Sequence, residues 1–247
     1  MFKLFSRTKH EKQKGGLSLL NADMHSHLIP GIDDGSPDME TSLQLIRGMA
    51  GLGYSKLITT PHIMWDMYRN ERDDILRRLE ELQSAVKKEG IEIQLHAAAE
   101  YFLDEHVELL LKKNEPLLTI SGKMVLVEFS MALAPMNLKE ILFDLQMKGY
   151  QPIVAHPERY IYLEKNKEFY DELKDIGCLF QLNLLAVSGH YGKSSKELAN
   201  YLIKKGYYDL IGTDLHHDRH LAALYNPTLT ETVLKLYETG KIRNSLL

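Results

Sequence analysis

Short apolar runs alternate with amphipathic segments along most of the chain. The apolar runs have the length and composition of buried strands. In the amphipathic segments, apolar side chains recur three and four positions apart, which places them on one face of a helix. The pattern predicts strands at residues 19–24, 56–60, 91–98, 124–129, 152–155, 178–183 and 208–212.

Signals for the ends of helices fall between these predicted strands. Ser36-Pro37-Asp38 is typical of a helix start, and Gly51 and Gly53 indicate its end. Further helices are predicted from Asn70 or Asp73 to Gly90, near 104–112, from Asn137 to Gly149, over 165–176 and 193–205, and from Asn226-Pro227 onward.

Repeated strand–helix units predict a parallel sheet with right-handed crossovers. Seven units in one chain of 247 residues favour a distorted TIM-like (βα)7 barrel in the α/β class. An open doubly wound sheet is the alternative. The first predicted strand is not followed by Gly-x-Gly-x-x-Gly, which argues against the dinucleotide-binding version of that sheet.

The first twenty residues differ from the rest of the chain. They hold a single acid, Glu11, and no apolar stretch like that of a secretory signal. Their basic residues are Lys3, Arg7, Lys9, Lys12 and Lys14. We predict a basic flexible arm over residues 1–20, followed by a single domain over 21–247. Contact of the arm with a partner or a membrane is the alternative to a disordered tail.

Composition excludes several classes of protein. The chain has 30 Lys and Arg against 34 Asp and Glu, and a net charge of −4 argues against a nucleic-acid binder. Cys178 is the single cysteine, which excludes an internal disulfide and a multi-cysteine zinc site. No apolar run approaches the roughly 20 residues of a membrane span, so we predict no transmembrane segment. The unusual count is that of histidine, 11 residues.

Histidines and carboxylates cluster just after the predicted strands, where parallel α/β folds place their functional groups. They are His25, His27, Asp34, His62, Glu100, Glu128, His156, Asp214 and His216. The His-x-His spacing puts both imidazoles on one face of an extended segment. Imidazole with carboxylate suits Zn, Mn or Fe. Each motif alone has a structural explanation, but their joint placement predicts two or three ions held together, which suits displacement at phosphorus.

The spacing of residues argues against other hydrolytic mechanisms. Leu184 stands where a cysteine-dependent phosphatase loop starting at Cys178 needs arginine. Gly192-Lys193-Ser194 resembles the end of a Walker A loop, but Val187 occupies the position of its first glycine. Neither His-Glu-x-x-His nor Gly-x-Ser-x-Gly occurs.

Six motifs in order resemble the PHP (polymerase and histidinol phosphatase) superfamily, and within it the bacterial CpsB/YwqE-type tyrosine phosphatases of capsule and exopolysaccharide operons. They are DMHSHLIPGIDDG at 23–35, TPH at 60–62, AEY at 99–101, VEFS at 127–130, AHPERY at 155–160 and GTDLH at 212–216. The resemblance implies a barrel of the PHP type that binds three divalent ions, with manganese expected first and iron or zinc as alternatives.

The resemblance also implies a role for each matching position. His25 and His27 would bind the first ion with Glu100 and Asp214. Glu100 would bridge to a second ion held by Glu128 and His156. Asp34, His62 and His216 would hold the third ion. Arg159 would meet the phosphate, so that Arg159, Asp214 and His62 are the expected catalytic residues.

The implied activity is metal-dependent hydrolysis of protein phosphotyrosine, in which a metal-bridging hydroxide attacks phosphorus. The implied substrate is the tyrosine-rich tail of a polysaccharide-export tyrosine kinase. We expect a cytoplasmic protein, attached peripherally to the inner membrane if the kinase recruits it; the sequence leaves the oligomeric state open. An aromatic substrate slot is one interpretation of five residues near the motifs, and core packing is the other. These residues are Trp65, Tyr68, Tyr101, Phe129 and Tyr160.

Three other functions stay open on the sequence. One is a small-molecule phosphomonoesterase of the histidinol-phosphatase type, which would use the same metal chemistry. Another is a metal-dependent deoxyribonuclease, against which the acidic net charge argues. The third is a regulatory module whose barrel only anchors a partner kinase.

Overall fold

Parallel strands form the centre of the molecule in the computed structural model, which describes residues 16–247. One sheet has the order β1-β2-β4 and the other has the order β3-β5-β6-β7-β8-β9, and every pairing between these strands is parallel. The strands are β1 (Ala22–Asp23), β2 (Lys56–Thr59), β3 (His62–Ile63), β4 (Gln94–Ala97), β5 (Glu100–Phe102), β6 (Met124–Glu128), β7 (Gln151–Val154), β8 (Leu179–Asn183) and β9 (Leu210–Gly212).

The two sheets are parts of one curved wall. β2 and β3 follow each other across Thr60 and Pro61, where proline has no N–H to donate to a ladder. The Ala98 N–H donates to the Thr59 carbonyl, and the Glu100 N–H donates to the Pro61 carbonyl, so pairing continues past both breaks. Counting β2 with β3 and β4 with β5 gives seven strand positions. This confirms the predicted distorted (βα)7 barrel.

The wall closes between its first and last strands. A parallel bridge joins Ser26 and Leu215 just beyond β1 and β9. There the Asp214 N–H donates to the His25 carbonyl, and the His27 N–H donates to the Leu215 carbonyl, both at 2.8 Å. This closure brings the segments that follow β1 and β9 together at the C-terminal mouth of the barrel.

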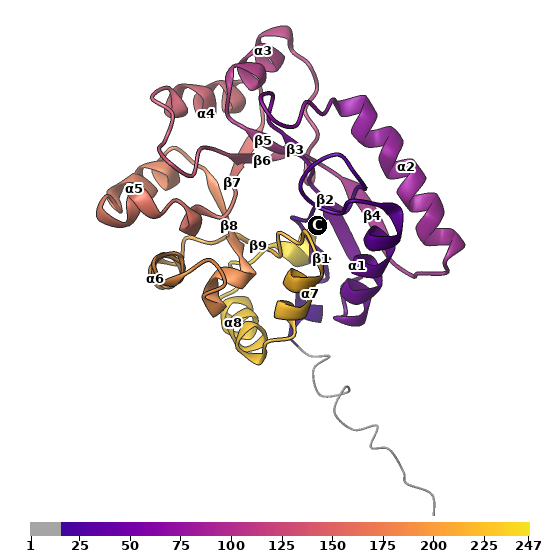
Figure 1. The fold of residues 1–247 in the computed structure, drawn as a ribbon. Helices are drawn as coiled ribbons and strands as arrows, with labels where there is room; N and C mark the ends of the chain where they lie inside the picture. Colours follow the sequence, from indigo (N-terminus) through magenta and orange to yellow (C-terminus); the bar gives the residue numbers. More distant parts are fainter. Residues whose placement is uncertain (1–15) are drawn as a thin grey trace, which may run out of the picture.

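Helices surround the strands, so that each apolar helix face packs on the barrel (Figure 1). α2 buries Ile75, Leu79, Leu82 and Val86 at helical spacing. Asp38 caps α1 and Asp104 caps α3, each by accepting a backbone N–H. The helices are α1 (Met39–Gly51), α2 (Arg72–Lys88), α3 (Glu105–Lys113), α4 (Leu138–Met147), α5 (Glu168–Asp175), α6 (Lys193–Lys205), α7 (Asp218–Leu224) and α8 (Pro227–Glu238).

The barrel interior is packed with apolar side chains rather than open. Its cluster consists of Met24, Ile58, Ala98, Ile120, Leu126, Ile153, Ala155, Leu179 and Leu210. Met24 directly precedes His25, and Ala155 directly precedes His156. The packed interior therefore supports the chain at the points where it enters the candidate site.

The first predicted strand is largely wrong. Only Ala22–Asp23 is strand, because Asn21 adopts a left-handed backbone with φ 59° that ends the preceding segment. That segment, Leu17–Leu20, is a 3₁₀ helix whose Leu17 and Leu20 are buried, although the predicted arm included it. The rest of the arm, residues 1–15, lies outside the described residues.

α7 was not predicted. The helix begins after His217, whose ring accepts the His220 N–H, and histidine is not a usual N-cap residue. Local signals for its start were therefore missing from the sequence.

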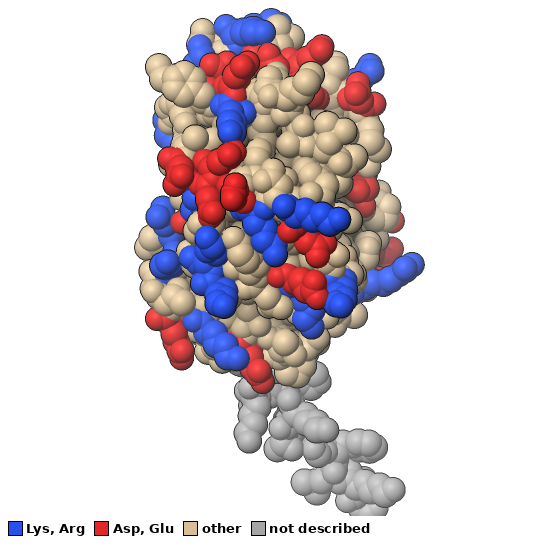
Figure 2. Space-filling view, turned by 90° about the vertical axis from the view of Figure 1, so that its left-hand side faces the viewer, with Lys and Arg blue, Asp and Glu red and all other residues tan. Residues whose placement is uncertain are grey.

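The surface of the described part has mixed charge. On the face that carries α4 and α5, acidic and basic side chains are interspersed (Figure 2). None of the helices within residues 16–247 combines the length and apolar character needed to cross a membrane.

Candidate metal centre

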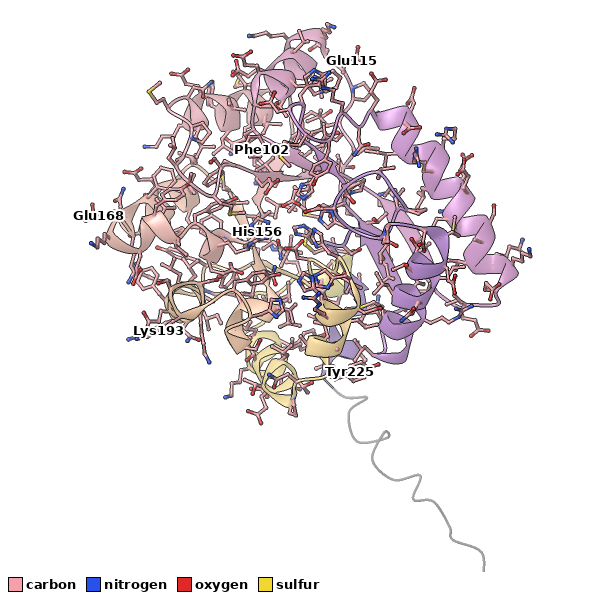
Figure 3. The ribbon with its side chains drawn as sticks, viewed as in Figure 1. Phe102, Glu115, His156, Glu168, Lys193 and Tyr225 are labelled. Carbon is pink, nitrogen blue, oxygen red and sulfur yellow. The ribbon has the colours of Figure 1, made fainter. Side chains whose placement is uncertain are left out.

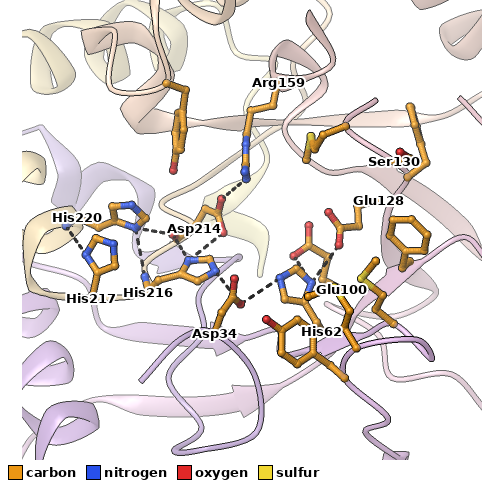
Figure 4. Close-up of a pocket in the computed structure, with 17 residues that line it drawn as sticks. Asp34, His62, Glu100, Glu128, Ser130, Arg159, Asp214, His216, His217 and His220 are labelled. Carbon is orange, nitrogen blue, oxygen red and sulfur yellow. Dashed lines mark hydrogen bonds and ion pairs between the residues drawn. The ribbon is translucent and has the colours of Figure 1, made fainter. Parts of the chain in front are cut away.

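All nine histidines and carboxylates predicted as ligands meet at the C-terminal mouth of the barrel. Figure 4 shows those that line the pocket: Asp34, His62, Glu100, Glu128, Asp214 and His216. His25, His27 and Asp34 follow β1, and His156 follows β7; Figure 3 shows His156 close to the barrel axis. The remaining five stand at or just beyond other strands of the wall. These are His62 in β3, Glu100 in β5, Glu128 in β6, and Asp214 and His216 after β9.

The first group of potential ligands is fully buried and consists of His25, His27, Glu100 and Asp214. The His25 Nε2 atom lies 3.1 Å from Glu100 Oε2 and 3.2 Å from Asp214 Oδ1. The His27 Nε2 atom lies 3.5 Å and 3.4 Å from the same two oxygens. The four side chains therefore aim at one point, as the resemblance implied for the first ion.

The second group lies nearer to solvent and consists of His27, Asp34, His62 and His216. Asp34 Oδ1 is 3.5 Å from His62 Nε2 and 3.5 Å from His216 Nε2. The Asp34 side chain is about half exposed. This group contains the three residues expected around the third ion, with His27 in addition.

The third group differs from the expected one. It consists of His62, Glu100 and Glu128, with His62 Nδ1 3.1 Å from Glu128 Oε1 and 3.4 Å from Glu100 Oε2. The expected member was His156. Its Nε2 atom is 2.9 Å from Glu100 Oε1 but 4.0 Å from Glu128 Oε2. Both histidines therefore face the Glu100–Glu128 pair, and His62 reaches two of the three groups.

The chemistry of these side chains fits divalent metal ions. Imidazole and carboxylate are the ligands that Zn, Mn and Fe accept. In addition, His62 Nδ1 and His156 Nδ1 are buried nitrogens without a hydrogen-bond partner. Buried polar atoms are normally paired, so the unpaired His62 Nδ1 beside Glu100 and Glu128 indicates a site that another group satisfies.

Nearby carboxylates raise the pKa of two buried imidazoles, His25 and His27. Burial lowers the pKa of His25, but Glu100 and Asp214 outweigh burial and raise the pKa to about 9. Burial likewise opposes the charge on His27, yet Asp33 and its other carboxylate neighbours raise its pKa well above the usual value. The site thus favours cationic partners at its centre.

Three polar residues that the sequence reasoning did not select position the candidate ligands. Asp33 Oδ2 lies 2.7 Å from His27 Nδ1 and also accepts the His62 N–H. Gln181 Oε1 lies 2.9 Å from His25 Nδ1, which leaves Nε2 of that ring facing the carboxylates. Such partners fix the orientation of a ligating ring.

The third of these residues is Asn183. Its Nδ2 donates to Asp214 Oδ2 at 2.9 Å and to the Tyr191 hydroxyl at 3.0 Å. Gln181 and Asn183 are two positions apart in β8, so both side chains lie on the same face of the strand. Two amides on one face of an otherwise apolar strand were a signal that could have identified them.

Unusual backbone conformations coincide with the site. Among the described residues, four other than glycine have positive φ, and His156 (φ 32°) and Asp214 (φ 52°) are two of them. Such conformations cost free energy and persist where the surroundings impose them. Position 212 has no room for a side chain, because a Cβ atom there would lie 2.6 Å from the His25 Cβ; this explains the glycine.

Arg159 reaches the site from the 3₁₀ turn that follows His156. Its Nη1 donates to Asp214 Oδ2 at 2.9 Å, and its guanidinium lies 4.8 Å from the centre of the Tyr191 ring. Burial lowers the pKa of Arg159, but Asp214 and Tyr191 outweigh it and raise the pKa, so the side chain stays cationic. A cation therefore stands at the rim of the candidate ligand groups.

Two of the five aromatic residues near the motifs line the pocket, and the other three do not. Tyr68 and Phe129 line the pocket above the site. Tyr101 and Tyr160 are buried, and their hydroxyls accept the N–H groups of Leu118 and Phe129. Trp65 stacks on His106 away from this pocket. Core packing therefore explains Tyr101 and Tyr160, because each hydroxyl finds a backbone partner inside the protein.

Fold and site together define a class: a parallel α/β barrel with three overlapping groups of potential metal ligands at its C-terminal mouth. The chain belongs to the family described as capsular polysaccharide synthesis, CpsB/CapC, whose model matches residues 21–240.

Similar sequences support this family membership. Tyrosine-protein phosphatase YwqE of Bacillus subtilis (strain 168) is 29% identical over 195 residues, which cover 79% of this chain and 77% of that protein. Tyrosine-protein phosphatase CpsB of Streptococcus pneumoniae is also 29% identical, over 79% of this chain and 82% of that protein.

The fold matches a solved structure of the same family. That structure comes from work on YwqE of Bacillus subtilis and CpsB of Streptococcus pneumoniae, described as unique metal-dependent tyrosine phosphatases. It superposes with a TM-score of 0.76 and 26% identity, over 90% of this chain and 94% of the other.

Proposed function

We propose that this protein is a metal-dependent tyrosine phosphatase that hydrolyses phosphotyrosine in proteins. The observation that carries the proposal is the meeting of eight potential ligands in three overlapping groups at one mouth, with His156 beside Glu100. Membership of the CpsB/CapC family, with relatives named as tyrosine-protein phosphatases, supports the same activity.

We propose three divalent ions, manganese first, with iron or zinc as alternatives. His25, His27, Glu100 and Asp214 would hold one of them. His27, Asp34, His62 and His216 would hold another. Glu100 and Glu128 would hold the third with His156, and His62 stands beside them. When bound, such ions supply a nucleophile at neutral pH and neutralise the charge of a phosphate.

The chain's own groups would orient the substrate. The Arg159 guanidinium can form two parallel hydrogen bonds to phosphate oxygens, a geometry that arginine favours. In the structure it donates to Asp214 Oδ2, an atom that also accepts from Asn183. Arg159 can therefore turn toward a phosphate while Asn183 keeps Asp214 hydrogen-bonded. Asp214 and His62 both face Glu100, so both would lie where the phosphate meets the ions.

We also propose that the physiological substrate is the tyrosine-rich tail of a polysaccharide-export tyrosine kinase. A tyrosine-rich kinase tail would present phosphotyrosine in a flexible segment, and the open mouth suits such a segment. A cytoplasmic location, with recruitment to the inner membrane by the kinase, follows from that substrate. These proposals rest on family membership and not on contacts in this chain.

The decisive experiment measures metal content and phosphotyrosine-peptide hydrolysis on one sample. We expect turnover with Mn²⁺, loss of turnover with a strong chelator, and loss of both metal and turnover in His25→Ala. His96→Ala is the matched control, because His96 is an exposed histidine of β4 outside the site. Absence of turnover with Mn²⁺, or turnover that survives both chelator and His25→Ala, would refute the proposal.

Assays of several substrates on the same preparation distinguish the alternative functions. Faster turnover of histidinol phosphate than of a phosphotyrosine peptide would indicate a small-molecule phosphatase. Cleavage of DNA would indicate a nuclease. A preparation that binds only trace metal under metal-replete conditions would favour a binding module that anchors a kinase.

A further inference from the structure

The pocket above the candidate metal centre has a polar floor and an apolar rim. Its volume is about 460 Å³, within the range of small-molecule sites. Glu100, Asp214 and the other potential ligands form the floor and are mostly buried. Three of the chain's 10 methionines line the same pocket. They are Met64, Met67 and Met131, and we call them the methionine rim.

One side of the rim is a tight hairpin just after β3. Met64 and Tyr68 form an antiparallel bridge, with the Tyr68 N–H donating to the Met64 carbonyl at 2.7 Å. Trp65 anchors the hairpin from outside, because its N–H donates to Asp104 and its ring stacks on His106. Met67 is left 64% exposed although it lines the pocket.

The other side of the rim follows β6. Phe129 is buried and stacks on Tyr160, with ring centres 3.9 Å apart. The Tyr162 hydroxyl donates to the Ser130 carbonyl, which fixes the chain just before Met131. Figure 4 shows Ser130 beside Glu128, at the side of the pocket away from His217 and His220. Two anchored loops therefore present flexible thioethers to the same pocket.

The shape of the pocket decides what the rim contacts. A phosphate must reach the polar floor, so the group esterified to it must lie at the level of the rim. Tyr68 and Phe102 line this level as well, and Tyr68 stacks over His62 with ring centres 5.5 Å apart. Thioethers adapt to irregular shapes and make favourable contacts with aromatic rings.

We infer that the methionine rim, with Tyr68 and Phe102, forms the leaving-group site and selects phosphate esters of an aromatic alcohol over small non-aromatic phosphates. The inference rests on the proposed phosphatase function and deepens it. Because methionine side chains have many rotamers, the rim accepts the ring without a fixed orientation of the peptide around it. The residues are specificity-determining and lie outside the three groups of potential ligands.

The test compares two substrates on the metal-loaded enzyme. A phosphotyrosyl peptide needs the rim, whereas acetyl phosphate is activated and has no ring. In the double variant Met67→Ala/Met131→Ala, we expect kcat/KM for the peptide to fall about tenfold, mainly through KM. Turnover of acetyl phosphate should stay within about twofold of the unaltered protein.

Two controls separate contact from folding. Met67→Leu/Met131→Leu keeps most apolar area and should retain peptide kcat/KM within about threefold. Met147→Ala removes another exposed methionine, at the end of α4 and outside the pocket, and should change neither substrate.

The outcomes distinguish the two proposals. Equal losses for both substrates, or an unchanged peptide kcat/KM in the double alanine variant, would refute the proposed role of the methionine rim but not the phosphatase function. If the unaltered protein hydrolyses neither substrate with Mn²⁺, the phosphatase proposal fails, and the leaving-group site fails with it.

Discussion

At the scale of single residues, the affinity of the site for metal depends on the protonation of its histidines. With a pKa of about 9, His25 is protonated at pH 7 when no ion is bound. A metal ion needs the unprotonated ring nitrogen, so loading must release that proton. We therefore expect the apparent metal affinity to rise with pH up to about 9 as His25 loses its proton. Calorimetric titration at pH 7 in buffers of different ionisation enthalpy measures the released protons, and a heat independent of the buffer would contradict the expectation.

The single cysteine provides a second test at this scale. Burial raises the pKa of the Cys178 thiol to about 12, and the side chain is almost inaccessible. At pH 8 only about one thiol in ten thousand is ionised, so alkylation of the native protein should be negligible.

We expect Cys178→Ala to keep phosphatase turnover while lowering the free energy of unfolding by about 1 kcal/mol. Turnover and thermal melting of the variant, with and without iodoacetamide, check both points. Loss of turnover on alkylation of the folded protein would point to a thiolate mechanism instead.

At the scale of elements, β9 must pass very close to the site. An alanine Cβ at position 212 would lie 2.6 Å from the His25 Cβ and 2.9 Å from Gln181 Nε2. Gly212→Ala should therefore displace His25 or strand β9, at a cost of about 1–3 kcal/mol, and weaken metal binding.

Gly51→Ala is the matched control for this change. Gly51 ends α1, and its Cβ would meet only the Tyr225 hydroxyl, at 3.9 Å. We expect this substitution to leave metal binding intact and to stabilise the protein by less than about 1 kcal/mol. Metal titration and thermal melting of both variants provide the comparison. Equal metal affinity in Gly212→Ala and the unaltered protein would show that the site tolerates the added atom.

Elements with local signals were predictable from the sequence. α2 has apolar residues at helical spacing, and Asp38 and Asp104 are common cap residues, so these helices lie close to their expected positions. The candidate ligands were predictable for a related reason, since parallel strands bring their C-terminal ends to one edge. α7 starts at a histidine cap, and its start depends on packing beside the site rather than on a local motif.

At the scale of the whole molecule, the closure of the barrel includes a contact that no local pattern reveals. Asn244 is buried near the C-terminus, 222 residues from Ala22. Its Nδ2 donates to the Ala22 carbonyl at 3.0 Å and to the Ile211 carbonyl at 2.6 Å, and its Oδ1 accepts the Ile211 N–H at 2.9 Å. One side chain thus joins β1 and β9 away from the mouth, while the Ser26–Leu215 bridge joins their continuations at the mouth.

Asn244→Ala removes all three hydrogen bonds at the closure of the barrel. At about 1 kcal/mol each, we expect the free energy of unfolding to fall by about 3 kcal/mol. Turnover of the folded protein should change little, because the candidate site lies at the opposite ends of β1 and β9. Denaturant unfolding and steady-state kinetics on the same samples measure the two effects separately. Asn226→Ala is the control: Asn226 accepts one N–H as the cap of α8, so its loss should cost only about 1 kcal/mol. If the two alanine variants are equally stable, β1 and β9 hold together without Asn244, and the bridge at the mouth with the Asp23–Thr213 hydrogen bonds suffices to close the barrel.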